Sequence, residues 1–227
     1  MKKKFITMLL LSVLIFGLTA CKKTEINLQD YTIEERQNLF AANNDLYTVT
    51  LCTGKRENNY SFDGIVGEKT CFAILSLTRN DNKILANDNY SYTITINEEQ
   101  LTGFLQKSEV DNSYCIDLQK EVLSDATINI QVSFTGYSFN ENLLNISNNF
   151  NVDCKTAIAI ANDQLKENTK NIISNNSNIE VVTKILTDNS ALDVDNYYWY
   201  VGVISTNGET MGILIDANSG EILAKKV

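Results

Sequence analysis

Apolar and polar residues alternate along much of the chain between Leu46 and about residue 139. A period of two, typical of half-buried strands, recurs in four stretches: 47–52, 92–96, 114–118 and 128–134. The run CFAILSLTR, 71–79, is more continuously apolar, as expected of a central strand. Because polar turn-forming clusters separate these stretches, the pattern indicates an antiparallel sandwich or barrel. Over 46–140 we predict a β-sandwich and expect an immunoglobulin-like arrangement.

A helical pattern begins after residue 150. Asp153 is placed to cap a helix, and apolar residues follow it on one helical stripe: Cys154, Ala157, Ile158, Ala161 and Leu165. Strands are predicted beyond this helix at 179–186, 197–205, 211–217 and 221–227. Asn207-Gly208 favours a hairpin with a type I′ turn between two of these strands. We therefore predict a small α+β domain over 150–227.

The segment before the sandwich, 21–45, is predicted to hold a tether and a short helix. The residues from Lys22 to Asp30 are polar. In TIEERQNLFAANNDL, Thr32 is placed as an N-cap and Glu35 as its capping-box partner, with apolar residues on one side.

The first twenty residues have the pattern of an export signal. MKKK is basic, and FITMLLLSVLIFGL is apolar but too short for an ordinary membrane span. The next residues, LTAC, end at Cys21 and resemble the lipobox of bacterial lipoproteins. This resemblance implies that residues 1–20 are a signal peptide and that Cys21 is acylated, palmitate being one such acyl group. It also implies that the body is held at the extracytoplasmic side of the cell membrane, since two acyl chains give stable anchoring.

The net charge of the chain limits the classes of partner that it can bind. The full chain carries a net charge of −9, and removal of residues 1–20 takes away three lysines and no acid, leaving −12. Nucleic-acid binding requires clustered Lys and Arg, so we expect no nucleic-acid partner.

Four cysteines remain after Cys21: Cys52, Cys71, Cys115 and Cys154. Cys154 lies on the apolar stripe of the predicted helix, which indicates a buried side chain. If one disulfide forms in this exported chain, we expect it between Cys52 and Cys115, because both face away from the apolar side of their strands. The chain has no His and no Cys-x-x-Cys, so we predict neither a metal site nor a cofactor.

The residues VDCKTAIAIA and YYWYVGVISTNGETMGILIDANSGEIL resemble the PepSY domain. That family has a helix packed on a small antiparallel sheet and ends in an Asp-Ala-x-Ser/Thr-Gly-Glu pattern, found here from Asp216 to Glu221. The resemblance covers 150–227. Cys154, Lys155 and Thr156 depart from the residues usual in the family. The resemblance implies a binding or regulatory role, such as restraining a cell-surface peptidase.

Asp216 is either a functional carboxylate or part of a turn. Its side chain can accept bonds from backbone N–H groups two or three residues later, and Gly220 supplies a backbone conformation with positive φ. We therefore interpret Asp216 and Gly220 as structural.

The run Tyr197, Tyr198, Trp199 and Tyr200 is a candidate partner-binding surface, since Tyr and Trp are favoured at such surfaces. Alternate residues of a strand face opposite sides, so one pair must pack on the helix while the other is solvated or contacts a partner. An aromatic strand covered by a neighbouring domain is the simpler interpretation.

No catalytic residues stand out. The absence of His excludes Ser-His-Asp and Cys-His catalysis, and no nucleotide-binding fingerprint is present. We expect a non-catalytic binding or regulatory lipoprotein. A structural or adhesive envelope protein is the alternative, and a carboxylate-dependent hydrolase is a third.

Overall fold

The computed structural model describes residues 26–58, 61–80, 89–109, 112–175, 177–187 and 197–227. The predicted signal peptide, Cys21 and the start of the predicted tether lie outside the described residues.

The described chain is mostly antiparallel β-sheet with one α-helix, which confirms the predicted β-rich architecture. The helices are η1 (Leu28–Tyr31), η2 (Ile146–Asn149) and α2 (Cys154–Ser174), the first two being 3-10 helices. The strands of the N-terminal part are β1 (Thr32–Asn43), β2 (Tyr47–Glu57), β3 (Lys69–Arg79), β4 (Ser91–Ile96), β5 (Glu99–Phe104), β6 (Gln106–Lys107), β7 (Tyr114–Asp117), β8 (Ile128–Phe134) and β9 (Tyr137–Asn145). Those of the C-terminal part are β10 (Ile179–Thr187), β11 (Tyr197–Ser205), β12 (Thr210–Asp216) and β13 (Ile222–Lys226).

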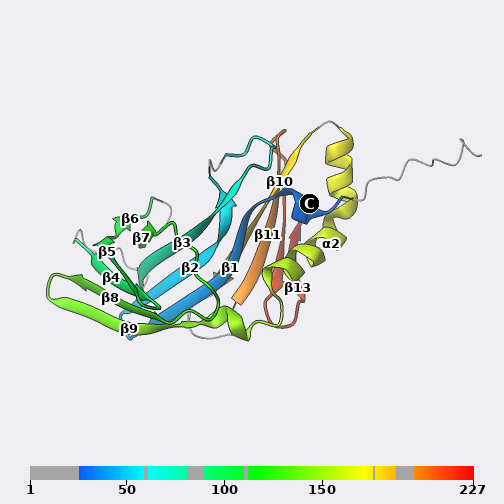
Figure 1. Ribbon diagram of the computed structural model, residues 1–227. Coiled ribbons are helices and arrows are strands. Elements are labelled where there is room, and N and C mark those ends of the chain that lie inside the picture. Colours follow the sequence, from blue (N-terminus) through cyan, green and yellow to red (C-terminus); the bar gives the residue numbers. More distant parts are fainter. Residues whose placement is uncertain (1–25, 59–60, 81–88, 110–111, 176, 188–196) are drawn as a thin grey trace, which may run out of the picture.

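One long sheet runs through both parts in the order β13-β12-β11-β10-β1-β2-β3-β7-β6 (Figure 1). A second set of strands, β5-β4-β8-β9, joins it where β9 pairs with the last part of β1. The pairing of β1 with β10 is parallel, at Thr32↔Val181 and Glu34↔Val182. Strand β1 therefore belongs to both parts of the molecule.

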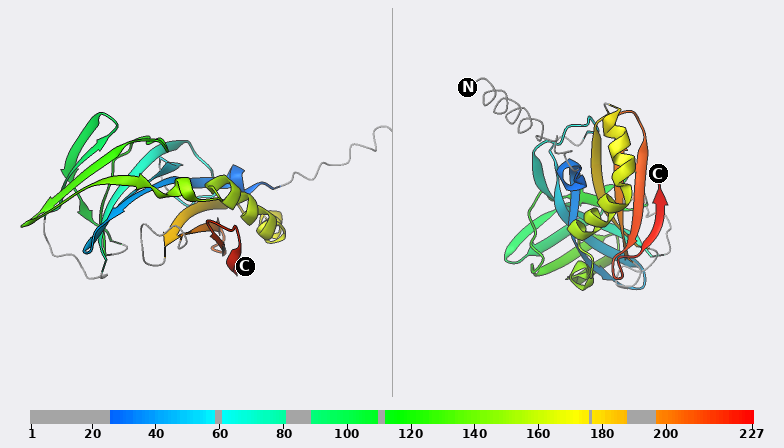
Figure 2. Two further views of the ribbon diagram at one scale, coloured as in Figure 1. Left: turned by 90° about the horizontal axis from the view of Figure 1, so that it is seen from below. Right: turned by 90° about the vertical axis from the view of Figure 1, so that its right-hand side faces the viewer.

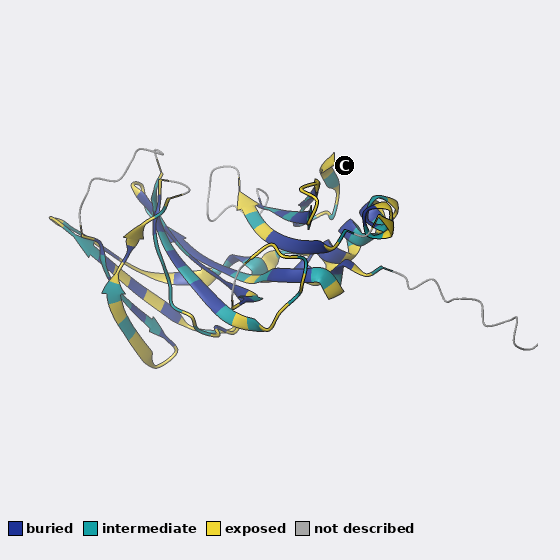
Figure 3. Cartoon of the chain, turned by 90° about the horizontal axis from the view of Figure 1, so that it is seen from above, coloured by how far each residue is buried: buried dark blue, intermediate teal, exposed yellow. Residues whose placement is uncertain are grey.

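Two hydrophobic cores lie on opposite faces of β1–β3. In β1, Leu39 and Ala41 face the core that α2 covers, whereas Phe40 and Ala42 face the core shared with β4, β8 and β9. This division follows from strand geometry, since successive side chains point to opposite faces. Figure 3 shows buried segments along these central strands and exposed ones at the outer hairpins.

The prediction of a short helix that begins at Thr32 is wrong. Residues 32–43 form β1, and Thr32 instead closes η1, its hydroxyl donating to the Leu28 carbonyl at 3.0 Å. The apolar stretch from Leu39 to Ala42 is buried on both faces of the sheet, and pairing with β2, β9 and β10 outweighs the local capping signal. The predicted tether also ends earlier than expected, because Leu28 is only 1% exposed and belongs to the core.

The helix predicted after residue 150 is confirmed as α2. Asp153 is its N-cap, and its carboxylate accepts the Thr156 N–H at 2.7 Å. All five residues of the predicted apolar stripe are buried. Figure 2 shows α2 lying along one face of the strands β10 to β12, where these side chains join the core.

Candidate functional site: a groove between α2 and strands β12–β13

The aromatic run in β11 divides as strand alternation predicts. Tyr197 and Trp199 are each 1% exposed and lie in the core beneath α2. Tyr198 and Tyr200 lie on the opposite face and are half-buried. The ring of Tyr200 lies across Gly202 and Gly212, where an added Cβ would come within 2.8 Å of it. The run therefore forms no common four-residue binding surface.

Trp199 links the sheet to the segment that leads into α2. Its indole Nε1 donates to the Val152 carbonyl at 2.7 Å, and Val152 N–H donates to the Ala217 carbonyl at 3.0 Å. Phe150 packs against both buried aromatics, with ring centroids 5.4 Å from Tyr197 and 6.3 Å from Trp199. These contacts give Tyr197 and Trp199 a role in the core.

Asp216 is at the start of a tight turn. Its Oδ1 accepts the N–H groups of Asn218 at 2.9 Å and Ser219 at 2.7 Å, and also the Ser219 hydroxyl. Gly220 has φ +73°. Hydrogen bonds from the Ser219 backbone lower the pKa of the Asp216 carboxyl below its usual value. All these bonds remain within the turn, so they fix its shape.

None of the four described cysteines is disulfide-bonded, so the predicted Cys52–Cys115 bridge is not formed in this structure. Strand β3 lies between them: Cys52 is opposite Ile74, and Cys115 is opposite Ser76. Strands two positions apart are about 10 Å from each other, whereas a disulfide requires a Cα separation of about 4.4–6.8 Å. The side chain of Cys52 points away from the β-sandwich core, as predicted, but it is also buried, because it packs in the core beneath α2.

Two buried carboxylates that the sequence did not single out hold the loop between β2 and β3. Glu57 accepts the Gly67 N–H, and Glu180 accepts the Gly64 N–H. Glu57 is 4% exposed and Glu180 1%. Burial raises the pKa of the Glu180 carboxyl, and the nearby negative charges of Glu57 and Asp63 add to the rise. We call Glu57 and Glu180 the loop pins.

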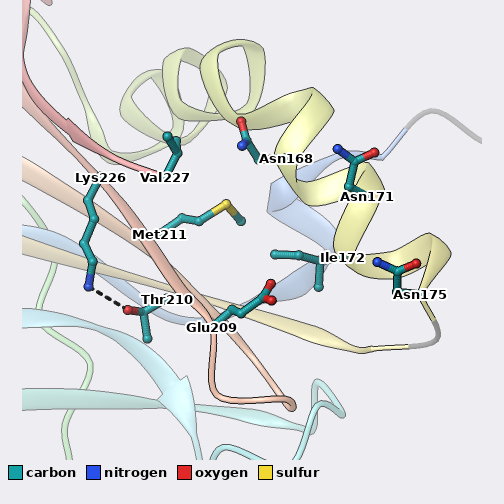
Figure 4. Close-up of a pocket in the computed structure, with 9 residues that line it drawn as sticks. All are labelled: Asn168, Asn171, Ile172, Asn175, Glu209, Thr210, Met211, Lys226 and Val227. Carbon is teal, nitrogen blue, oxygen red and sulfur yellow. Dashed lines mark hydrogen bonds between the residues drawn. The ribbon is translucent and has the colours of Figure 1, made fainter.

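A groove of about 550 Å³ opens between the C-terminal half of α2 and the strands β12 and β13 (Figure 4). Ile172 and Met211 form its apolar floor, and both are buried. Asn168 and Asn171 lie above them on α2, and Asn175 lies at its C-cap. The remaining lining residues are Glu209, Thr210, Lys226 and Val227.

The groove can bind a polar chain over an apolar surface. Each Asn amide has both donors and an acceptor, the same groups that a peptide backbone offers. The lining residues come from the end of α2, the start of β12 with the residue before it, and the end of β13. They are far apart in the sequence and become neighbours only in the folded chain. The spacing of the three Asn residues at i, i+3 and i+7 was the one signal in the sequence that could have revealed it.

Within the described residues, no group of three or more His, Cys, Asp or Glu side chains could hold a metal ion. None of the helices in this described part is both long enough and apolar enough for a membrane span. No protein-family model, no curated protein and no solved structure matches this chain.

Proposed function

We propose that this chain is a lipid-anchored extracytoplasmic protein that works by binding, and that it holds an extended segment of a partner protein in the groove between α2 and β12–β13. The observation that carries the proposal is the groove itself, with three amide side chains above an apolar floor. Its floor supplies non-directional affinity, and its amides give hydrogen bonds that fix the direction of a bound chain.

Strand β13 supports this mode of binding. It is at the end of the sheet order, and β12 is its one partner among the described strands. An extended peptide can add to such an edge through main-chain hydrogen bonds. Lys226, on β13, and Glu209, the residue before β12, place one positive and one negative charge along the groove. We infer a partner segment of mixed polar and apolar residues.

The anchoring part of the proposal rests on the N-terminal sequence. A basic start, a short apolar stretch and LTAC before a polar region are the features of a lipoprotein signal, with Cys21 as the acylated residue. Two acyl chains would hold the body at the membrane, whereas one gives only reversible binding.

The proposed fold assignments are immunoglobulin-like for the N-terminal sheets and PepSY-like for 150–227. The packing of α2 on the antiparallel strands β10 to β12 supports the second, as does the turn that begins at Asp216. From this resemblance we propose a cell-surface peptidase as the partner and its restraint as the regulatory outcome.

The groove can be tested by blocking it. Residues 24–227 are used as bait in a pull-down from envelope extract, alongside two tryptophan variants on α2. Asn171→Trp fills the groove, whereas Ala159→Trp adds the same bulk to an exposed position that does not line it. We expect the parent and Ala159→Trp to enrich the same protein and Asn171→Trp to lose it.

The identity and activity of the captured partner separate the alternatives. A captured peptidase whose activity falls when the bait is added supports regulation. Captured glycan or host protein indicates adhesion instead. If Asn171→Trp captures the partner as well as Ala159→Trp does, the groove is not the binding site.

A further inference from the structure

The loop between β2 and β3 exposes two large apolar side chains. Phe62 is 51% exposed and Ile65 is 67% exposed, although only two residues separate them. Single exposed apolar residues are ordinary on soluble proteins, but adjacent ones more often mark contact surfaces. The feature to be explained is why this loop presents them.

Hydrogen bonds hold residues 63–67 of the loop in place. The loop pins Glu57 and Glu180 accept the N–H groups of Gly67 and Gly64, and Asp63 Oδ1 accepts the Ile65 N–H at 3.0 Å. Gly64 has φ +80°, and an added Cβ there would be 2.6 Å from Asn178 and from Thr206. The loop is thus packed against the start of β10 and the β11–β12 hairpin. A surface ordered before binding loses little entropy when it binds.

The base of this loop is joined to the first described element of the chain. Glu35 Oε1 accepts from Gln29 Nε2 at 2.9 Å and from Lys69 Nζ at 2.8 Å, which joins η1 to the first residue of β3. Figure 1 shows the start of β1 and the β2–β3 loop in the half of the molecule that holds α2, with β4 and β5 at the far end of the other half.

The lipid anchor would keep this end close to the membrane. Cys21 precedes Ile26, the first described residue, by five positions. Because an extended chain spans at most about 3.3–3.6 Å per residue, this connection reaches no more than about 18 Å. Ile26 therefore remains within that distance of the bilayer surface, and the base of the loop is joined to the nearby η1 through Glu35 and Lys69.

We propose that Phe62 and Ile65 insert into the interfacial region of the membrane that holds Cys21, as a second contact. The inference rests on the proposed lipid anchoring. A single point of attachment leaves the body free to rotate, whereas a second contact fixes its orientation. The β11–β12 hairpin, which supplies Glu209 to the groove, packs against the same loop, so the groove is held near the membrane and favours a membrane-attached partner.

The contact is apolar and not electrostatic. The predicted mature chain carries −12, and Asp63 and Glu68 beside the apolar residues are exposed. Anionic headgroups would repel these charges. The surface therefore fits a zwitterionic lipid interface.

The test uses the full lipidated chain reconstituted in phosphatidylcholine vesicles that contain brominated acyl chains. A tryptophan probe replaces Phe62 in one variant and Phe104 in another. Phe104 is 65% exposed and lies on β5 at the opposite end, so it is the matched control. The natural Trp199 is buried, and its signal is measured in the parent chain and subtracted. We expect the probe at position 62 to be quenched several-fold more than the probe at position 104.

Equal quenching at both positions, or none at position 62, overturns the inference. The mass of the N-terminal peptide is measured in the same samples, so failure of the anchoring is distinguishable from failure of the loop contact. An unmodified Cys21 refutes the first, and an acylated Cys21 with an unquenched probe in the Phe62→Trp variant refutes the second.

A double variant, Phe62→Ser with Ile65→Ser, tests the same contact without an added tryptophan. It should restore rotational freedom on the vesicle, measured by fluorescence anisotropy. An anisotropy unchanged from the parent contradicts the proposal.

Discussion

At the level of single residues, Asp216 shows how a carboxylate can be structural. Its Oδ1 accepts two backbone N–H groups and a hydroxyl. We predict that Asp216→Ala lowers the free energy of unfolding by about 1–2 kcal/mol at pH 7, a loss typical of a capping side chain. Chemical denaturation with fluorescence of Trp199 measures it.

The pH dependence of this loss has a definite sign. Because the folded-state pKa of Asp216 is lowered, its stabilisation is present above the unfolded pKa of about 3.9 and is lost as the pH falls through the folded value. The difference between the parent and Asp216→Ala should therefore shrink below about pH 4. Asp216→Asn, which keeps one acceptor oxygen, should be intermediate. A loss of partner capture with unchanged stability would show that Asp216 is functional.

The effect of Glu180 on stability should depend on pH in the opposite sense to that of Asp216. Among the described residues its Oε2 has no hydrogen-bond partner, and burial raises the pKa of its carboxyl. A raised folded-state pKa means that stability is lost as the pH rises through it. We predict that Glu180→Gln is at least as stable as the parent at pH 8 and that this advantage disappears towards pH 4. Thermal unfolding of both proteins across this range checks the sign, and a Gln variant that is weakest at pH 8 would disprove it.

The cysteines should differ in reactivity. Cys52 and Cys154 are buried, and burial raises the pKa of both thiols, that of Cys154 to about 12. Cys71 and Cys115 are only half-buried. We predict that iodoacetamide alkylates Cys71 and Cys115 of the native protein well before the other two, because the thiolate is the reactive form. Peptide mass spectrometry reads the order, and early labelling of Cys52 would contradict this burial pattern.

Among the helices and strands, the sequence predicted those in which apolar residues recur at a regular spacing. The stripe of α2 and the alternation in β11 depend only on which residues lie on one face, and both are present in the structure.

The β11–β12 hairpin is confirmed, but its turn is not type I′. Gly208 has positive φ and Asn207 does not, whereas type I′ requires both. Gly208 N–H bonds to the Ser205 carbonyl, which makes a longer loop.

The segment 32–43 shows where local signals fail. Thr32 and Glu35 have the spacing of a capping box, yet neither caps an α-helix. Glu35 instead binds Lys69, and the segment pairs with β2 along most of its length. A capping box contributes about 1 kcal/mol, which is less than pairing and burial on both faces of a strand supply. This competition involves residues far along the chain, so no local pattern reveals it.

Trp199 is the residue that fastens α2 to its sheet. We predict that Trp199→Phe lowers the free energy of unfolding by about 2–4 kcal/mol, because the buried Val152 carbonyl loses its donor and a cavity remains. Leu144→Ala, at a position 64% exposed, is the control and should change it by less than about 0.5 kcal/mol. Urea denaturation measures both, and similar losses would show that Trp199 is not a fastening point.

At the level of the whole molecule, the sequence suggested a sandwich and a separate C-terminal domain, whereas one sheet runs through both. The link is the parallel pairing of Thr32 with Val181. Pairing between positions so far apart along the chain leaves no trace in local composition. The groove and the loop pins depend on the same long-range packing: Glu180 follows the first residue of β10 yet holds a loop near residue 64.

The proposed function depends on an acylated Cys21 that holds a binding protein at the membrane. Labelling of producing cells with radioactive palmitate tests it most directly, with the parent and Cys21→Ala compared. We expect label on the parent in the membrane fraction, and a Cys21→Ala form that is unlabelled and does not partition there as the parent does. An unlabelled parent, or a Cys21→Ala form that partitions with the membrane just as the parent does, would contradict it.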